Sequence, residues 1–265
     1  MCELFAINSG EPVELSPLLR EFFTHGKENP HGWGVADLSA PLVRIVRSVE
    51  RADTSLEAER FLSHPHPCTN ALAHIRAATI GQVEPENCHP FAASDASGRH
   101  WTLIHKGTIF DFEPLSPYFY QQNGATDSER ILLYLIDQMN RKILEKGAPL
   151  ESDERFAVFS QLVGEMSEGN CLNLIVFDSD QFFVHANYQG ALNLLVSEEA
   201  ALFCTSPLRS ALATLAPCSA WEPLPLCTPL AFKQARLISS GVSHGHEYFD
   251  NEEDTHYLFQ DYAGL

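Results

Sequence analysis

The second residue of the chain, Cys2, carries the side chain best suited to nucleophilic chemistry. If the initiator methionine is removed, Cys2 presents a thiol and a free α-amine on one residue. An α-amine titrates at about 7.7–8.0, so a useful fraction is neutral at pH 7 and can accept the thiol proton. A free cysteine is, however, also a common core residue, and the run Leu4-Phe5-Ala6 that follows is apolar. Cys2 alone therefore fits either a nucleophile or the start of a buried strand.

Two charged residues and one glycine could serve either the fold or a bound substrate. Arg76 lies in the apolar segment 71–78 and needs an anionic partner, either a protein carboxylate or a substrate carboxylate that it binds in bidentate fashion. Asp127 stands in Thr126-Asp127-Ser128-Glu129, a helix-start sequence in which an acidic residue commonly acts as the N-cap. Gly107 leaves its backbone N–H unshielded at a predicted strand end, which suits a turn or an oxyanion site.

The cysteine and histidine pattern gives little support for a metal site. The seven cysteines are scattered, and none forms a Cys-x-x-Cys pair, which favours a reduced protein over a disulfide framework. His64, His66 and Cys68 alternate with prolines in an extended piece, and no further ligands recur at zinc spacing. His244 and His246 lie near the C-terminus and fit surface positions. We therefore predict a loop at residues 64–68 and no bound metal.

Composition limits the partners that this chain can have. The formal net charge of −18 argues against nucleic acid and anionic membranes, which require a positive surface. No stretch reaches the roughly 18–20 consecutive apolar residues of a membrane span. The N-terminus lacks the basic and apolar regions of a signal peptide, so we expect a cytoplasmic protein with Cys2 at its mature N-terminus.

The hydrophobic pattern predicts strands, two adjacent helices and more strands. Residues 12–27 fit a turn into a helix, and Gly32-Trp33-Gly34 indicates backbone packed closely on a neighbour, for which the N-terminal strand is a candidate. A strand over 100–105 should end at Lys106-Gly107, and helices should cover 130–146 and 156–166. Closely spaced strands follow at 172–177, 182–188, 192–196 and 202–204. This order predicts an α+β layered fold in one domain, residues 2–265, with residues 241–265 as a peripheral tail.

Six short motifs keep a common order along the first half of the chain. They are Met1-Cys2-Glu3-Leu4, His31-Gly32-Trp33-Gly34, Ala73-His74-Ile75-Arg76-Ala77-Ala78-Thr79, Glu86-Asn87-Cys88-His89-Pro90-Phe91, His105-Lys106-Gly107-Thr108-Ile109 and Thr126-Asp127-Ser128-Glu129. Residues 173–178 extend the pattern into the second half. Together they resemble the class II, or N-terminal nucleophile, glutamine amidotransferases, and most closely their stand-alone YafJ-like branch.

The resemblance implies a four-layer αββα sandwich of the N-terminal nucleophile (Ntn) hydrolase type and a role for each matched residue. Cys2 would attack the γ-carboxamide of glutamine, or of another γ-glutamyl amide, to form a γ-glutamyl thioester. Gly107 would donate its N–H to the oxyanion, and no cofactor would be needed. The residues implied in substrate binding are Arg76, Thr79, His89 and Asp127.

The sequence departs from the family pattern at Lys106, where the family has an asparagine whose amide is the second oxyanion donor. A lysine can also donate, and its charge can stabilise an oxyanion, but its side chain is longer and less fixed. The chain also carries no synthase domain to consume ammonia. Its expected partners are therefore glutamine or a γ-glutamyl compound, and a homodimer or a separate ammonia acceptor remains open. The alternative to an active amidase is a weakly active or non-catalytic subunit that binds glutamine or delivers ammonia.

Overall fold

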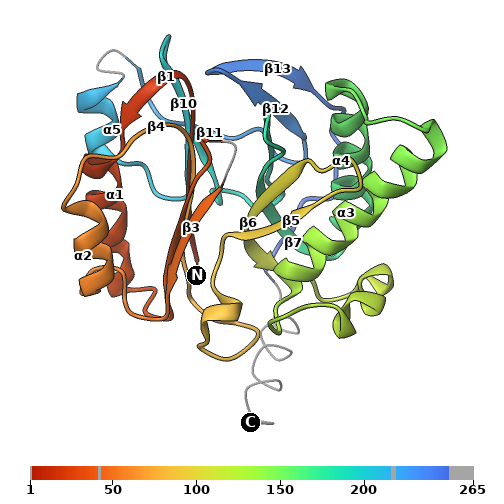
Figure 1. The fold of residues 1–265 in the computed structure, drawn as a ribbon, viewed down its shortest axis with the longest axis horizontal. Coiled ribbons are helices and arrows are strands. Elements are labelled where there is room, and N and C mark those ends of the chain that lie inside the picture. Colours follow the sequence, from red (N-terminus) through yellow and green to blue (C-terminus); the bar gives the residue numbers. More distant parts are fainter. Residues whose placement is uncertain (1, 41–42, 216–218, 251–265) are drawn as a thin grey trace.

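Two antiparallel sheets lie face to face in the computed structural model, with helices on both outer surfaces (Figure 1). The structure describes residues 2–40, 43–215 and 219–250. One sheet has the strand order β11-β9-β10-β1-β4-β2-β3, and the other has the order β13-β12-β8-β7-β6-β5. The prediction of a four-layer α+β sandwich is confirmed.

The seven-stranded sheet is made of β1 (Glu3–Glu14), β2 (Trp33–Asp37), β3 (Arg44–Ser48), β4 (Pro67–Ile75), β9 (Asn193–Val196), β10 (Ala200–Cys204) and β11 (Glu222–Pro223). The six-stranded sheet is made of β5 (Phe91–Ser94), β6 (His100–Thr108), β7 (Cys171–Phe177), β8 (Phe182–His185), β12 (Leu230–Lys233) and β13 (Arg236–Ser240). Helices α1 (Ser16–Phe23), α2 (Leu56–Leu62) and α5 (Arg209–Thr214) cover the first sheet, and α3 (Asp127–Lys146) and α4 (Ser152–Met166) cover the second. Three 3₁₀ segments are η1 (Thr24–Lys27), η2 (Pro85–Asn87) and η3 (Glu113–Tyr120).

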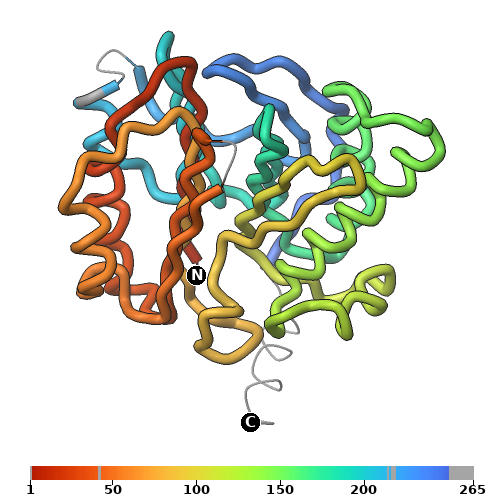
Figure 2. The backbone as a smooth tube through the Cα atoms, viewed as in Figure 1, coloured from red at the N-terminus to blue at the C-terminus, as the bar shows by residue number. Residues whose placement is uncertain are grey.

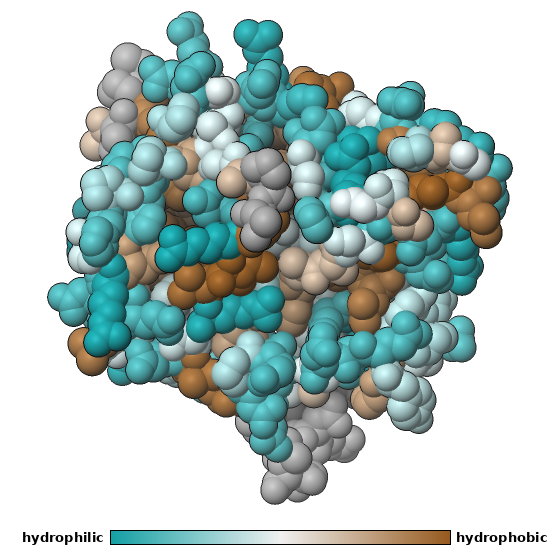
Figure 3. All heavy atoms as spheres, in the orientation of Figure 1, coloured by the Kyte–Doolittle hydropathy of each residue, from teal (hydrophilic) through white to brown (hydrophobic). Residues whose placement is uncertain are grey.

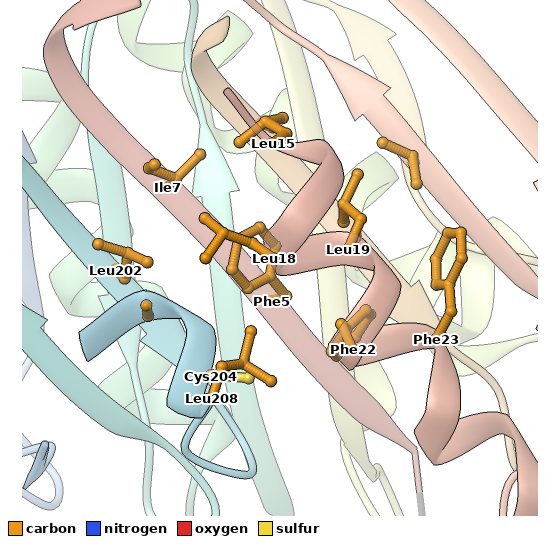
Figure 4. Packing of buried hydrophobic residues seen from close by; sticks show 14 of the residues in the cluster. Phe5, Ile7, Leu15, Leu18, Leu19, Phe22, Phe23, Leu202, Cys204 and Leu208 are labelled. Carbon is orange, nitrogen blue, oxygen red and sulfur yellow. The ribbon is translucent and has the colours of Figure 1, made fainter. Parts of the chain in front are cut away.

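Each layer of the sandwich is joined to the next by its own apolar cluster. Helix α1 places Leu18, Leu19 and Phe22 on its buried face, at helical spacing, and packs them onto β1 (Figure 4). The rings of Phe5 and Phe22 lie 5.7 Å apart. Between the two sheets, Leu4 of β1 belongs to the same cluster as Ile104 of β6. These contacts fix β1, and with it Cys2, against the second sheet.

Strand pairing corrects two predicted boundaries. Residues 12–14 belong to β1 rather than to a turn, because Val13 and Glu14 pair with Cys68 and Pro67 of β4 after an irregularity that begins at Asn8. Cys68 therefore lies in a strand and not in the predicted loop. Strand β6 does not end at Lys106-Gly107, because β7 pairs with it as far as Thr108 and Cys171. In both cases the partner strand, which sequence reasoning could not identify, sets the end of the element.

The close approach predicted around Trp33 is present, but its neighbour is different. A Cβ atom added at Gly34 would lie 2.1 Å from the carbonyl oxygen of His89. Strand β2 pairs with β3 and β4, and not with the N-terminal strand β1. Glycine at position 34 therefore admits the backbone of residue 89, which carries a candidate site residue.

The first part of the C-terminal segment packs on the second sheet. The Tyr248 N–H donates to the Asn187 carbonyl at 2.8 Å, and His244 Nε2 lies 2.9 Å from His185 Nε2. Residues 251–265, the rest of the tail predicted from the sequence, lie outside the described residues. No helix in the described part of the chain is long and apolar enough to cross a bilayer. Hydrophilic residues cover most of the face drawn in Figure 3.

Candidate active site

Cys2 lies directly before β1, a central strand of the seven-stranded sheet. Its Sγ atom is 3.3 Å from both the N–H and the carbonyl oxygen of Ala77, so the thiol can donate to one and accept from the other. Burial raises the pKa of the thiol, whereas the Ala77 backbone and the charges of Arg76 and Lys106 act in the opposite direction. Burial is the largest effect, so the pKa of the thiol stays above its usual value, and these three groups offset that rise only in part.

Arg76 directly follows β4, whose last residue pairs with Glu3, the residue after Cys2. Its guanidinium binds the loop that follows the strand. It donates to the carbonyl oxygens of Ile80, Gly81 and Gln82 at 2.9, 3.0 and 2.8 Å. Only 3% of the residue is exposed, and no described carboxylate lies within ion-pair distance of it. The buried protein ion pair considered from the sequence is thus replaced by three backbone carbonyls. These neutral partners leave the charge free to attract an anion.

Asp127 lies at the first turn of α3, but it is not the N-cap that an acidic residue there suggests. The N-cap is Thr126, whose hydroxyl accepts from the Glu129 N–H at 3.3 Å. Asp127 instead accepts from the Ile109 N–H at 2.9 Å through Oδ2, and from the Ser128 N–H at 2.9 Å through Oδ1. Its carboxylate is therefore anchored to the segment that follows β6.

Gly107 occupies a backbone conformation that other residues adopt only with strain. Its φ is +154°, and an added Cβ would lie 1.9 Å from the carbonyl oxygen of Cys171. Strand β7 therefore packs directly against the position of the missing side chain. This contact explains why a glycine stands here, beside the candidate nucleophile.

Substitution of this glycine should distort the site and lower stability. We expect Gly107→Ala to reduce the free energy of unfolding by about 2–5 kcal/mol, from backbone strain and overpacking combined. Gly98→Ala is the matched control, because Gly98 has φ +84° in the β5–β6 hairpin and nothing lies within 4 Å of an added Cβ. Denaturant titration of both variants tests this, and equal losses would contradict the steric explanation.

Lys106 is a buried lysine whose charge is not neutralised by a described partner. Only 6% of the residue is exposed, and its Nζ makes no hydrogen bond or ion pair with any described residue. Burial lowers the pKa of its ammonium group, and the negative potential of Glu3 and Cys2 acts against this. Lys106 does not line the small pocket around Cys2, but its charge acts on the Cys2 thiol.

Three buried histidines surround the site and favour their neutral forms. The rings of His74 and His89 stack with their centroids 4.0 Å apart, and His74 Nε2 lies 3.2 Å from the His105 carbonyl oxygen. Burial lowers the pKa of His74 to about 3 and holds the pKa of His89 well below its usual value. Neither ring nitrogen of His89 has a hydrogen-bond partner among the described residues, although the ring lines the pocket. His89 can therefore bond to a bound molecule.

These histidines should make the fold sensitive to acid. A histidine whose folded-state pKa lies below the unfolded value of about 6.5 binds more protons in the unfolded chain, so the free energy of unfolding falls as pH drops from 6.5 towards 3. Replacing His74 with glutamine should flatten this dependence, whereas replacing the exposed His64 should leave it unchanged. Urea titrations at pH 7 and pH 5 measure the change in the free energy of unfolding between the two pH values. The same change in wild type and in His74→Gln would refute the claim that buried His74 causes the acid sensitivity.

One small pocket brings most of the predicted residues together. Its volume is about 20 Å³, room for about one water molecule. Of the residues predicted from the sequence, the pocket is lined by Cys2, Arg76, Thr79, His89, Gly107 and Asp127. A larger substrate therefore requires that residues 80–82 move or that Arg76 exchanges its carbonyl partners for the substrate. Within the described residues, no group of three or more histidine, cysteine or acidic side chains is arranged to hold a metal ion.

The sequence analysis did not identify several of the pocket residues. The backbone of Ala77 contacts the thiol, and Ser128 and His105 line the pocket, with Ser128 Oγ 2.9 Å from His105 Nδ1. Ser128 and His105 stand inside motifs singled out from the sequence, so their proximity to Asp127 and Gly107 was a usable signal. No local pattern marks Ala77, because its contribution is a backbone N–H.

Comparison with known proteins identifies the family. The family model for class II glutamine amidotransferases matches residues 1–208. The chain belongs to this family. A Haemophilus influenzae protein named "Putative glutamine amidotransferase" is 26% identical over 190 residues, which cover 71% of this chain and 63% of that protein. The chain spans only 53% and 63% of the lengths of two curated relatives that it matches.

Solved structures show the same fold. A protein from Pseudomonas aeruginosa described as a "predicted glutamine amidotransferase" superposes with a TM-score of 0.64 at 18% identity, covering 90% of this chain and 100% of that one. Glutamine phosphoribosylpyrophosphate amidotransferase from B. subtilis superposes with a TM-score of 0.62 at 15% identity, covering 90% and 48%. The four-layer sandwich of this class II amidotransferase is therefore of the Ntn type, as the sequence resemblance predicted.

Proposed function

We propose that this class II amidotransferase is a cysteine amidohydrolase that acts on glutamine or on another γ-glutamyl amide. The observation that carries the proposal is the pocket in which the Cys2 thiol meets one fixed cation, Arg76, and one fixed anion, Asp127. A zwitterionic amino acid needs two opposite charges held at separate points, and its γ-carboxamide needs a nucleophile between them.

The reaction divides into two steps at Cys2. Removal of Met1 frees the α-amine, which takes the proton of the thiol as the sulfur attacks the carbonyl carbon of the substrate γ-carboxamide. The C–N bond then breaks, the proton passes to the departing ammonia or amine, and a γ-glutamyl thioester remains on Cys2. Water hydrolyses the thioester to glutamate and restores the thiol. The ammonia released in the first step either leaves the protein or passes to a separate acceptor enzyme.

Each remaining pocket residue has a role in this scheme. Arg76 binds the α-carboxylate and Asp127 the α-ammonium group of the substrate, as charge-assisted hydrogen bonds. The Gly107 N–H stabilises the oxyanion of the tetrahedral intermediate. Thr79 and the unpartnered ring of His89 complete the polar wall of the pocket. Lys106 adds positive charge near the sulfur in place of an amide donor.

The proposal is tested by incubating purified protein, with Met1 shown by mass to be removed, with glutamine and with several γ-glutamyl amides. We expect release of glutamate from at least one of them. If glutamate is released from none, the chain is not an amidohydrolase for this substrate class.

Lys106 favours a second candidate function, a subunit that binds glutamine or delivers ammonia to a separate synthase with little turnover of its own. Restoring an amide donor discriminates between the two. If the site is weakened by the lysine, Lys106→Asn should raise kcat by about 10²–10³-fold, the value of one oxyanion donor. If Lys106 itself stabilises the oxyanion, the same substitution should lower kcat or leave it unchanged. Steady-state assays of both proteins with the best substrate give the answer.

A further inference from the structure

Three asparagines near the active site are fully buried. In the sequence they stand well after the motifs that supply the pocket residues. Asn170, Asn173 and Asn187 are each 0% exposed. They stand on the second sheet, near the start of β7 and just beyond the end of β8. In Figure 2 this part of the backbone follows the green helices and is drawn in teal. Buried amides of this kind cost free energy unless their donors and acceptors are all used.

The side-chain amide of Asn170 binds the segment that follows β6 through both its oxygen and its nitrogen. Its Oδ1 accepts from the N–H groups of Phe110 and Asp111 at 2.6 and 3.0 Å. Its Nδ2 donates to the carbonyl oxygen of Asp111 at 2.9 Å, and also to the carbonyls of Met166 and Glu168 at the end of α4. Residues 110 and 111 are thus held directly after Ile109, whose N–H donates to Asp127.

Asn173 binds the same segment at its other end. Its Nδ2 donates to the carbonyl oxygen of Lys106 at 2.8 Å, one residue before Gly107. Its Oδ1 accepts from the N–H groups of Asn187 and Tyr188 at 3.2 and 3.3 Å. The two asparagines therefore fix the backbone on both sides of Gly107 and Ile109.

Asn187 connects the two other asparagines to the C-terminal segment. Its Oδ1 accepts from the Leu172 N–H at 2.8 Å, and its Nδ2 donates to the Asn170 carbonyl at 2.8 Å. The same Nδ2 lies 3.2 Å from the carbonyl oxygen of His246. Residue 248 also reaches the loop after β6, because the Tyr248 ring stacks on Phe110 at 6.0 Å.

We propose that Asn170, Asn173 and Asn187 are positioning residues of the amidase site. They hold residues 106–111 so that the Gly107 N–H points at the oxyanion and the Ile109 N–H keeps the Asp127 carboxylate in place for the substrate ammonium group. This inference rests on the proposed function. A network that served stability alone would not need to bind the backbone on both sides of the Gly107 and Ile109 N–H groups, at residue 106 and at residues 110–111.

The test compares two near-isosteric substitutions at opposite ends of the second sheet. Asn170→Asp keeps the acceptor but turns the donated hydrogen bonds into contacts between oxygens. Asp95→Asn is the matched control, because Asp95 is a buried hub that accepts from Ser97, Arg99 and Trp101 in the β5–β6 hairpin. If Asn170→Asp does not fold, Asn170→Ser removes the amide without burying a charge.

The first readout is the ratio of kcat/KM for glutamine to kcat/KM for glutaramate, which is glutamine without its α-amine. This ratio does not depend on how much of the enzyme is folded. We expect it to fall about tenfold in Asn170→Asp, the equivalent of one weakened charged hydrogen bond, and to stay constant in Asp95→Asn. If the enzyme does not turn over, the ratio of the binding constants of glutamate and glutarate takes its place.

The second readout is hydrogen exchange at the Ile109 amide, which needs no substrate. Faster exchange in Asn170→Asp, but not in Asp95→Asn, together with the lost selectivity supports the positioning role. Unchanged exchange and unchanged selectivity overturn it, even if the variant is less stable. Absence of any preference for the amino compounds in the wild type would instead refute the ammonium-binding role that the proposed function gives to Asp127, and the Ile109 exchange rate alone would then decide whether the network holds the segment.

Discussion

Replacing Cys2 with alanine is expected to abolish glutamate release, with a loss in kcat of at least about 10³-fold. The thiol is the only group in the pocket that can form the thioester, and the Ala77 backbone, Arg76 and Lys106 all act on it. The fold should persist, because Cys2 precedes β1 and the hydrogen bonds of its sulfur to described residues are the two with the Ala77 backbone. The loss in kcat is measured from the rate at which glutamate is released from glutamine or a γ-glutamyl amide.

Cys68→Ala is the matched control for this substitution. Cys68 is buried in β4 at the opposite end of the strand from Arg76, and its sulfur contacts Ser39 and Asp37. Its loss should lower stability while leaving the turnover of folded protein unchanged. If Cys2→Ala retained activity, or if Cys68→Ala lost as much, the nucleophile would have been assigned to the wrong cysteine.

Replacing Asp127 with asparagine should weaken the enzyme selectively towards substrates that carry an α-ammonium group. The amide keeps an acceptor for the Ile109 N–H, so the backbone of the segment after β6 should stay in place. The negative charge is lost, together with the acceptor for the Ser128 N–H. A charge-assisted hydrogen bond is worth about 1.5–3 kcal/mol, or roughly 10–100-fold in kcat/KM. We therefore expect that loss for glutamine.

Glutaramate serves as the control substrate for this variant. Because it has no α-ammonium group, its kcat/KM should change little between wild type and Asp127→Asn. The assays are steady-state measurements of both substrates on both proteins. Equal losses for the two substrates would mean that Asp127 shapes the pocket through its hydrogen bonds and does not bind the ammonium group.

The sequence predicted the layered fold and most of the pocket because short motifs carry local information about both. Cys2, Arg76, Thr79, His89, Gly107 and Asp127 were selected from motifs, and all six line one pocket. The type of each residue indicated its chemistry, such as a cation or an anion. Their proximity arises from the pairing of β1 with β4 and the stacking of the two sheets, which bring positions 2, 76 and 107 together.

The errors in the sequence analysis have a common physical cause, contact between segments distant in the chain. Gly34 admits the backbone of residue 89 rather than that of the N-terminal strand, and the β6 boundary is set by pairing with β7. Thr126 caps α3 because Asp127 is drawn to the Ile109 N–H. The asparagine network could not be foreseen either, because single asparagines carry no periodic pattern and their partners lie up to 67 residues away.

The central claim is that Cys2, freed of Met1, forms a covalent γ-glutamyl thioester. The most direct test is to mix the native protein with glutamine, or with the best γ-glutamyl amide, quench in acid within the first turnover and measure the mass of the N-terminal peptide. We expect a peptide that begins at Cys2 and carries one added glutamyl group, which disappears in Cys2→Ala and persists in Cys68→Ala. A peptide that still begins with Met1 in an active protein, or turnover with no adduct on Cys2, would contradict the claim.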